Sequence, residues 1–207
     1  MLSFFKKNKN KNLRGESYYD RENMIHNIGD LFSVFNPETT KYYTTNQNIK
    51  FNELKLSEIK EKDIIKMLKE PDFVIGEKDG LNGHKVLFYR HLVNNLIFLM
   101  QFHFLKGNFL FISNTTSSVT TISKEDKISF VNRIVKKYIP EINIDLKNGF
   151  EIKISDENNN FLNIIDGVNF KVNYINNSPY NQKLLKNPNL AKEMTEDNFD
   201  TKLDDYF

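Results

Sequence analysis

The stretch that decides the fold of this chain is NNLIFLMQFHFLKGNFLFISN, Asn94–Asn114. It holds two apolar runs around Gly107-Asn108, a residue pair typical of a two-residue β-hairpin turn. A strand with one solvated face alternates apolar and polar side chains, and these two strands barely alternate. The second face of the hairpin is therefore covered either by another part of the chain or by a partner.

Helical periodicity and strand patterns flank this hairpin on both sides. Before it, we predict a helix from a Ser57 cap to Pro71, then an extended segment at 73–75 and a strand at 84–92. After it, Ser123 and Asp126 match a capping pattern and begin a helix that ends at Pro140. The segment 149–155 alternates cleanly as a strand, and 161–175 has the pattern of a hairpin with an Asp-Gly turn.

The order of one helix followed by three strands therefore occurs twice. We predict an α+β fold: two helix-plus-antiparallel-meander units (αβββ twice) with an extra N-terminal helix between Asp20 and Phe35. The expected organisation is a flexible basic tail at 1–16, a first α+β unit at 17–120, a second at 121–180 and an acidic tail at 181–207. A short helix capped by Asn187 is expected in that last tail.

The loop between the first two strands decides what each face of the sheet carries, because a one-residue slip exchanges the faces. With a three-residue loop, 93–95, most phenylalanines gather on one core face. The members of that face are Val86, Phe88, Leu92, Leu96, Phe98, Met100, Phe102, Phe104, Phe109 and Phe111. The opposite face is then apolar at its rim and polar at its centre, where Tyr89, His91, Gln101 and His103 lie.

The composition excludes several classes of site. The chain has no cysteine and a net charge of +2, so thiolate chemistry is excluded and the folded part offers no strongly basic surface. No apolar run is long enough to span a membrane, and the charge order at the start is unlike a signal peptide, so we expect a cytoplasmic protein. The lysine-rich start, 1–14, leaves weak contact with nucleic acid or a membrane surface as an alternative.

Candidate catalytic groups are sparse. The histidines are His26, His84, His91 and His103, and the strands that carry the last two hold no Asp or Glu to complete a metal site. The hydroxyl-rich segment 113–121 lacks a nucleophile elbow and reads as a linker. We therefore expect no catalytic residue, no metal and no cofactor.

The first unit resembles a known fold. LSEIKEKDIIKMLKEPDFVIGEKDG, KVLFYR, LIFLMQFHF and GNFLFIS, within 56–113, have the order of a short helix ending in L-x-E-P-D, a Tyr-Arg strand and an F-x-F-x-x-G-x-F hairpin. This order resembles the repeat unit of the β-lactamase-inhibitor-protein-like fold, which is shared with small outer-membrane assembly lipoproteins. The resemblance implies a non-catalytic module that binds a protein through its sheet, and it carries over no functional residue. Those proteins are exported, whereas this chain has no lipidation cysteine.

These features favour a non-catalytic, cytoplasmic protein-binding module, such as an adaptor, a chaperone or an immunity-like inhibitor. Its contact residues would be Tyr89, His91, Gln101 and His103, because aromatic and polar groups among apolar neighbours make good hot spots. Two alternatives stay open: an enzyme whose site is assembled from residues distant in sequence, and a nucleic-acid or membrane accessory protein acting through its lysine-rich tail.

Overall fold

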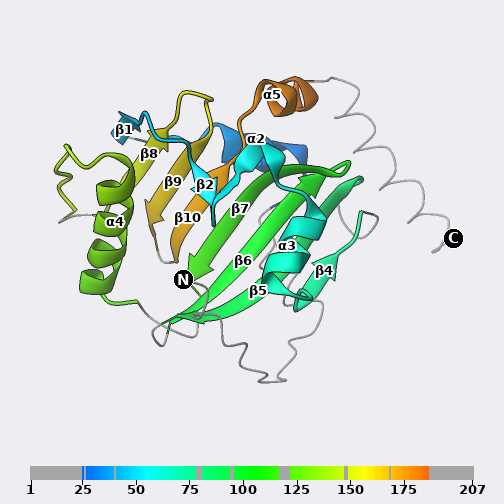
Figure 1. Cartoon of the computed structure of the whole chain (residues 1–207), viewed down its shortest axis with the longest axis horizontal. Helices are drawn as coiled ribbons and strands as arrows, with labels where there is room; N and C mark the ends of the chain where they lie inside the picture. Colours follow the sequence, from blue (N-terminus) through cyan, green and yellow to red (C-terminus); the bar gives the residue numbers. More distant parts are fainter. Residues whose placement is uncertain are drawn as a thin grey trace, which may run out of the picture.

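The computed structural model describes residues 25, 27–39, 41–77, 81–93, 96–116, 122–146, 149–167 and 169–186. Eight strands of this part form one sheet (Figure 1). Their order is β1 (Lys41–Thr44), β8 (Glu151–Ser155), β9 (Phe161–Asp166), β10 (Phe170–Ile175), β7 (Asn108–Thr116), β6 (Leu96–Leu105), β5 (His84–Val93) and β4 (Phe73–Ile75). Neighbouring strands are antiparallel except β1 and β8, so the predicted α+β class is confirmed.

The two predicted units share this sheet. β5, β6 and β7 come from the first unit and β8, β9 and β10 from the second, and the antiparallel pairing of β7 with β10 joins them. β2 (Lys50–Phe51) and β3 (Leu54–Lys55) form a separate two-stranded sheet, which packs on the main one through Phe51. The last strands of the two units, β7 and β10, are therefore neighbours at the centre of the sheet.

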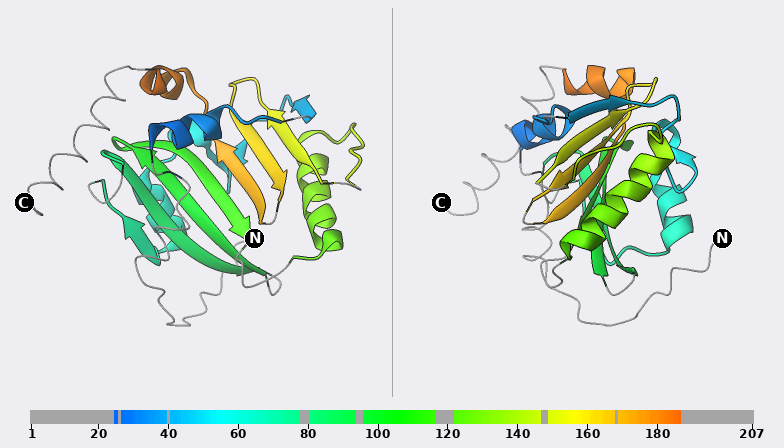
Figure 2. Two further views of the ribbon diagram at one scale, coloured as in Figure 1. Left: turned by 180° about the vertical axis from the view of Figure 1, so that it is seen from behind. Right: turned by 90° about the vertical axis from the view of Figure 1, so that its left-hand side faces the viewer.

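Helices lie on both sides of the sheet. The helix of each unit, α3 (Glu61–Leu68) and α4 (Lys124–Tyr138), lies on one side, which we call the front face (Figure 1). The N-terminal helix α2 (Ile28–Phe35) crosses the other side, the rear face, and α5 (Pro179–Leu185) lies at the same end of the sheet (Figure 2). The prediction of an extra N-terminal helix is therefore confirmed.

Caps explain where these helices begin. Ser123 Oγ accepts a hydrogen bond from the Asp126 backbone N–H at 3.0 Å, as the capping pattern predicts. The predicted Ser57 cap is wrong, because 56–58 form a 3₁₀ turn, η1 (Leu56–Glu58), and α3 begins only at Glu61. There the Asp63 carboxylate accepts from the Lys60 backbone N–H at 3.2 Å.

The helices at the two ends differ from expectation. In the described part, α2 begins after Asn27, whose side-chain oxygen accepts from the Asp30 N–H at 3.0 Å. Asp20, the expected cap, lies outside the described residues, as does the helix expected after Asn187. α5 was not predicted, since Pro179 at its first position is followed by a mixed polar sequence without a clear apolar stripe.

The register of β5 against β6 differs from the prediction. Val93 pairs with Leu96, so two residues, not three, separate the paired positions. The slip of one residue places Leu87, Tyr89 and His91 on the face of Phe98, Met100 and Phe102, and sends Val86 and Phe88 to the rear face. The predicted segregation of the phenylalanines onto one face is therefore wrong.

A tight turn and a bulge between β6 and β7 divide the phenylalanines further. The turn residues are Lys106 and Gly107, with φ of +48° and +76°, not the predicted Gly107-Asn108. The register shifts between His103 and Phe104, as at a β-bulge, so Phe104 pairs with Phe109 while His103 pairs with Phe111. Phe109 therefore joins the front core and Phe111 joins the rear one.

Both faces of the central strands are covered by the chain itself. The front core packs α3 and α4 against residues such as Leu87, Phe102, Ile112 and Ile152. The rear core contains α2 residues, α5 residues and strand residues, namely Leu31, Val34, Phe35, Leu185, Leu105, Leu110, Phe111, Phe161 and Ile175. Of the two alternatives for the second face, internal cover is the one found over this end of the sheet.

The turn of the last hairpin is longer than the expected Asp-Gly pair, since Asp166 pairs with Phe170.

Candidate functional site

The four predicted contact residues do not share a face. Tyr89 and His91 lie on the front face, and Gln101 and His103 lie on the rear face, because of the register described above. Tyr89, Gln101 and His103 are 2%, 1% and 0% exposed. The prediction of one amphipathic patch is therefore wrong. Partner binding by these residues stays a prediction, and in this conformation a partner reaches only His91, which is half-buried.

Tyr89 has a structural environment. Its hydroxyl donates a hydrogen bond to the backbone carbonyl of Lys69, just after α3, at 3.1 Å. Its ring stacks on His91, with centroids 6.3 Å apart and an interplanar angle of 17°. Burial raises the pKa of Tyr89, so its hydroxyl stays protonated as the donor. Tyr89 therefore anchors α3 and supports the His91 ring from the side.

On the rear face, two histidines and a glutamine form a buried chain. His84 Nε2 lies 3.1 Å from His103 Nδ1, and His103 Nε2 lies 3.2 Å from Gln101 Oε1. If Gln101 accepts, His103 carries its proton on Nε2 and in turn accepts from His84 Nε2–H. Burial lowers the pKa of His84 to about 4 and that of His103 well below its ordinary value. Both rings are therefore neutral near pH 7 and make a packed polar network.

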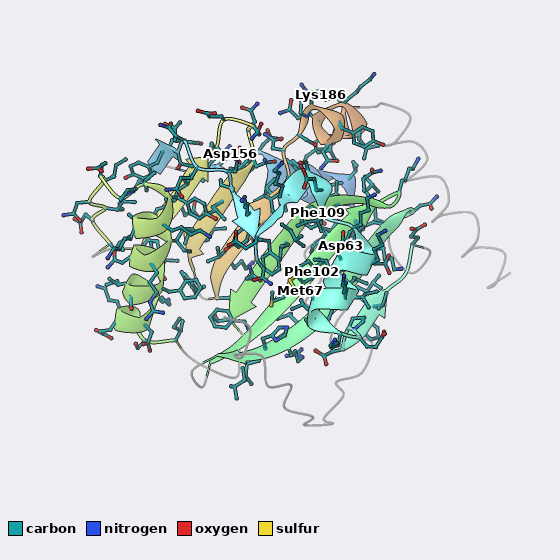
Figure 3. All side chains as sticks on the ribbon, viewed as in Figure 1. Asp63, Met67, Phe102, Phe109, Asp156 and Lys186 are labelled. Carbon is teal, nitrogen blue, oxygen red and sulfur yellow. The ribbon has the colours of Figure 1, made fainter. Side chains whose placement is uncertain are left out.

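A groove on the front face lies where the two units meet, and we call it the seam groove. Its volume is about 190 Å³. Its lining residues are Phe51, His91, Phe98, Met100 and Asn114 from the first unit and Phe130, Val172 and Tyr174 from the second. The groove arises because α3 and α4 stand apart in front of the sheet, over its β5 and β8 sides (Figure 1). Figure 3 labels Met67 of α3 and, beside it, Phe102 of β6.

Ring-to-ring contacts hold the walls of the seam groove. Phe51 meets Tyr174 edge to face, with centroids 5.7 Å apart, and Phe98 stacks on Phe130 at 5.8 Å. Phe130 also meets Phe170 edge to face at 5.8 Å. Such pairs add roughly 0.5–1.5 kcal/mol each beyond their buried area, so the walls are preorganised. The groove is a formed feature of the fold.

Polar groups are few in the seam groove. The side-chain oxygen of Asn114 is buried and has no hydrogen-bond partner. Burial raises the pKa of Tyr174, so its hydroxyl is a neutral group. An apolar concavity with a small number of polar groups is the usual form of a binding site, and it suits an apolar ligand with one polar function.

Sequence reasoning identified His91 but missed the rest of the seam groove. Phe51, Phe130 and Val172 come from β2, α4 and β10, which only the tertiary fold brings together. One signal was present. Phe130 is a large aromatic residue that lies off the apolar stripe predicted for its helix, which consists of Ile128, Val131, Ile134, Val135 and Tyr138.

The described ranges contain neither a metal-binding cluster nor a membrane-spanning helix. There, no three side chains among His, Asp and Glu come together in a way that could hold a metal ion. No helix in the same ranges has the length and apolar character needed to cross a membrane. No family model, curated protein or solved structure matches the chain. The resemblance to the β-lactamase-inhibitor-protein-like fold therefore stays a prediction.

Proposed function

We propose that this protein is a non-catalytic binding module that holds one large apolar side chain of a partner polypeptide in the seam groove. The observation that carries the proposal is the groove itself, with aromatic walls from both units. Roles as an adaptor, a chaperone or an immunity-like inhibitor all fit such a module. The expected cytoplasmic location is part of this proposal.

The size of the groove supports a single anchoring side chain. Its volume is about 190 Å³, and an apolar cavity of about 150 Å³ is enough to bind benzene. One aromatic ring or one long aliphatic side chain therefore fills it. Anchors of this kind, seated in a pocket and surrounded by weaker contacts, dominate the affinity of protein interfaces.

This proposal confines the contact surface to the front face, whereas the residues predicted from the sequence lie on both faces. His91 is the predicted contact residue that it keeps, because His91 lines the groove beside Phe98, its partner across the strands. Tyr89 acts behind His91 as a support. Gln101 and His103 have no part in the contact, since both are buried on the opposite face. The alternative role of the lysine-rich start lies outside the described residues.

The test fills the groove from inside. Val172→Phe places a larger side chain at a buried position of the lining. Lys171→Phe introduces the same aromatic side chain at the neighbouring position of β10, which lies on the rear face. Random peptides displayed on phage are selected against the wild-type chain, and the enriched peptides are synthesised. We expect them to share one aromatic or long aliphatic anchor, whose replacement by Ala abolishes binding.

The two variants decide whether those peptides use the groove. Val172→Phe is expected to weaken peptide binding at least about tenfold, whereas Lys171→Phe leaves the Kd unchanged. Thermal melting checks that both variants are folded. Peptides without a common apolar anchor, or peptides that bind folded Val172→Phe as tightly as wild type, would contradict the proposal.

A further inference from the structure

A second, larger cavity opens at the end of the sheet where β8 turns into β9. Its volume is about 640 Å³, within the usual range for small-molecule sites. Three parts of the chain line it: 48–49 with 55 and 57–58, the turn 156–160, and 178–179. Figure 3 marks Asp156 at this end of the sheet, away from the seam groove.

The turn that forms one wall is held rigidly by Asp156. The carboxylate accepts hydrogen bonds from the backbone N–H groups of Ile49, Asn158 and Asn160, each at 2.9 Å. It also accepts from the Asn160 side chain at 3.3 Å. Across the turn, Asn158 Nδ2 donates to Asn48 Oδ1 at 2.8 Å. The amide groups on this wall therefore keep their positions before any ligand arrives.

Most of the residues that line this cavity carry polar side chains. Amide side chains come from Asn48 and from 158–160, and hydroxyls come from Ser57 and Ser178. Asn160 is 6% exposed, and its side-chain oxygen is buried without a hydrogen-bond partner.

The charges of the lining restrict the ligand. The lining carries one lysine, Lys55, and three carboxylates, Glu58, Asp156 and Glu157. Its net formal charge is therefore −2, which disfavours anions. Glu58 pairs with Lys55 at 3.1 Å and Asp156 already accepts four hydrogen bonds, which leaves Glu157, at an exposed position, as the carboxylate open to a cation. A neutral ligand rich in groups that both donate and accept hydrogen bonds matches the lining best.

We infer that this cavity binds a neutral polyhydroxylated ligand of the carbohydrate class. Sugar hydroxyls both donate and accept, and so do the amides and hydroxyls of the lining taken together. This site is separate from the seam groove and does not depend on the proposed function.

The experiment titrates the methyl glycosides of glucose, galactose, mannose and N-acetylglucosamine into the full chain and follows saturation-transfer NMR. The variant Asn48→Ala/Asn158→Ala removes the exposed amide pair of the cavity, and Asn46→Ala is the matched control on an exposed amide outside it. We expect saturable binding of at least one glycoside with a Kd of about 1 mM, weakened roughly tenfold in the double variant and unchanged in the control.

Three outcomes would overturn the inference. They are no saturable signal from any of the four glycosides, equal affinity in the folded double variant, and saturable binding of inorganic phosphate or arginine methyl ester in place of the glycosides. Thermal melting confirms that each variant is folded, so a loss of binding is not a loss of structure.

Discussion

His84 and His103 lie nearly parallel inside the rear face, with ring centroids 5.2 Å apart and an interplanar angle of 20°. His103 also stacks on Phe111, at 4.0 Å. Two imidazoles in such a place are stable only while neutral, because a buried charge without a counter-ion is costly. The pair therefore links the stability of the fold to pH.

Acid should destabilise the protein through this pair. Burial lowers the pKa of His84 in the folded state from 6.5 to about 4, so between these values the unfolded chain binds a proton that the folded chain does not. The free energy of unfolding therefore falls as the pH is lowered from about 6.5 toward 4, by about 3 kcal/mol for His84 alone. Urea titrations at a series of pH values measure this slope.

Two variants separate this effect from general acid sensitivity. His84→Gln removes the titrating group and should flatten the slope in that window, although it lowers stability at neutral pH. Ser113→Ala changes another buried polar residue of the rear face and should keep the wild-type slope. An unchanged slope in His84→Gln would show that the pair is not the cause.

Any side chain at position 107 should destabilise the fold. The turn requires a φ of +76° there, in the left-handed region that only glycine adopts without strain. Gly107→Ala is expected to lower the free energy of unfolding by roughly 1–2 kcal/mol, even though an added Cβ meets no atom within 4 Å. Gly149→Ala is the matched control, since its φ is ordinary and its nearest contact is 3.9 Å. Equal losses in the two variants, measured by urea unfolding, would mean that space and not φ decides.

The cap of α4 should contribute measurably to stability. Ser123→Ala removes the acceptor for the Asp126 N–H and is expected to cost about 1 kcal/mol. Ser129→Ala makes the same substitution at an exposed position inside the helix, where alanine is the better helix former, so it should be neutral or slightly stabilising. Melting temperatures of the two variants test this. An unchanged melting temperature in Ser123→Ala would show that the cap does not contribute to stability.

Asp156 should be the most sensitive residue of the β8–β9 turn. Asp156→Ala leaves the backbone N–H groups of Ile49, Asn158 and Asn160 without their acceptor, at an expected total cost of roughly 2–4 kcal/mol. Faster amide hydrogen exchange at Ile49 would locate the effect. Glu157→Ala, at the exposed neighbouring position, should change stability by less than about 0.5 kcal/mol. Slow exchange at Ile49 in Asp156→Ala would contradict this assignment.

Local sequence patterns predicted the elements well where the pattern is strong. The cap and apolar stripe of α4 gave its start and its buried face, and the alternation of β8 gave Ile152 and Ile154 as core residues. They failed where two local signals compete. Ser57 is a good cap residue, yet 56–58 form a 3₁₀ turn and α3 begins at Glu61.

The candidate sites could not be predicted in the same way. The seam groove needs side chains from five strands and a helix, and only His91 of its lining was singled out from the sequence. The polar cavity depends on one carboxylate that reaches the backbone of Ile49, 107 residues away. No pattern within one segment carries that information.

The amino-acid sequence by itself determined the α+β class, the repeated order of one helix and three strands, and most element positions, because periodicity and caps act over a few neighbouring residues. The tertiary structure decided the register of β5, the bulge beside Phe104, the pairing of β7 with β10 and the parallel pairing of β1 with β8. Each of these features is one of several possible pairings of whole strands. The pairings differ in free energy because each one packs the two faces of the sheet differently. Tyr89 and His91 are therefore separated from Gln101 and His103 by the sheet itself.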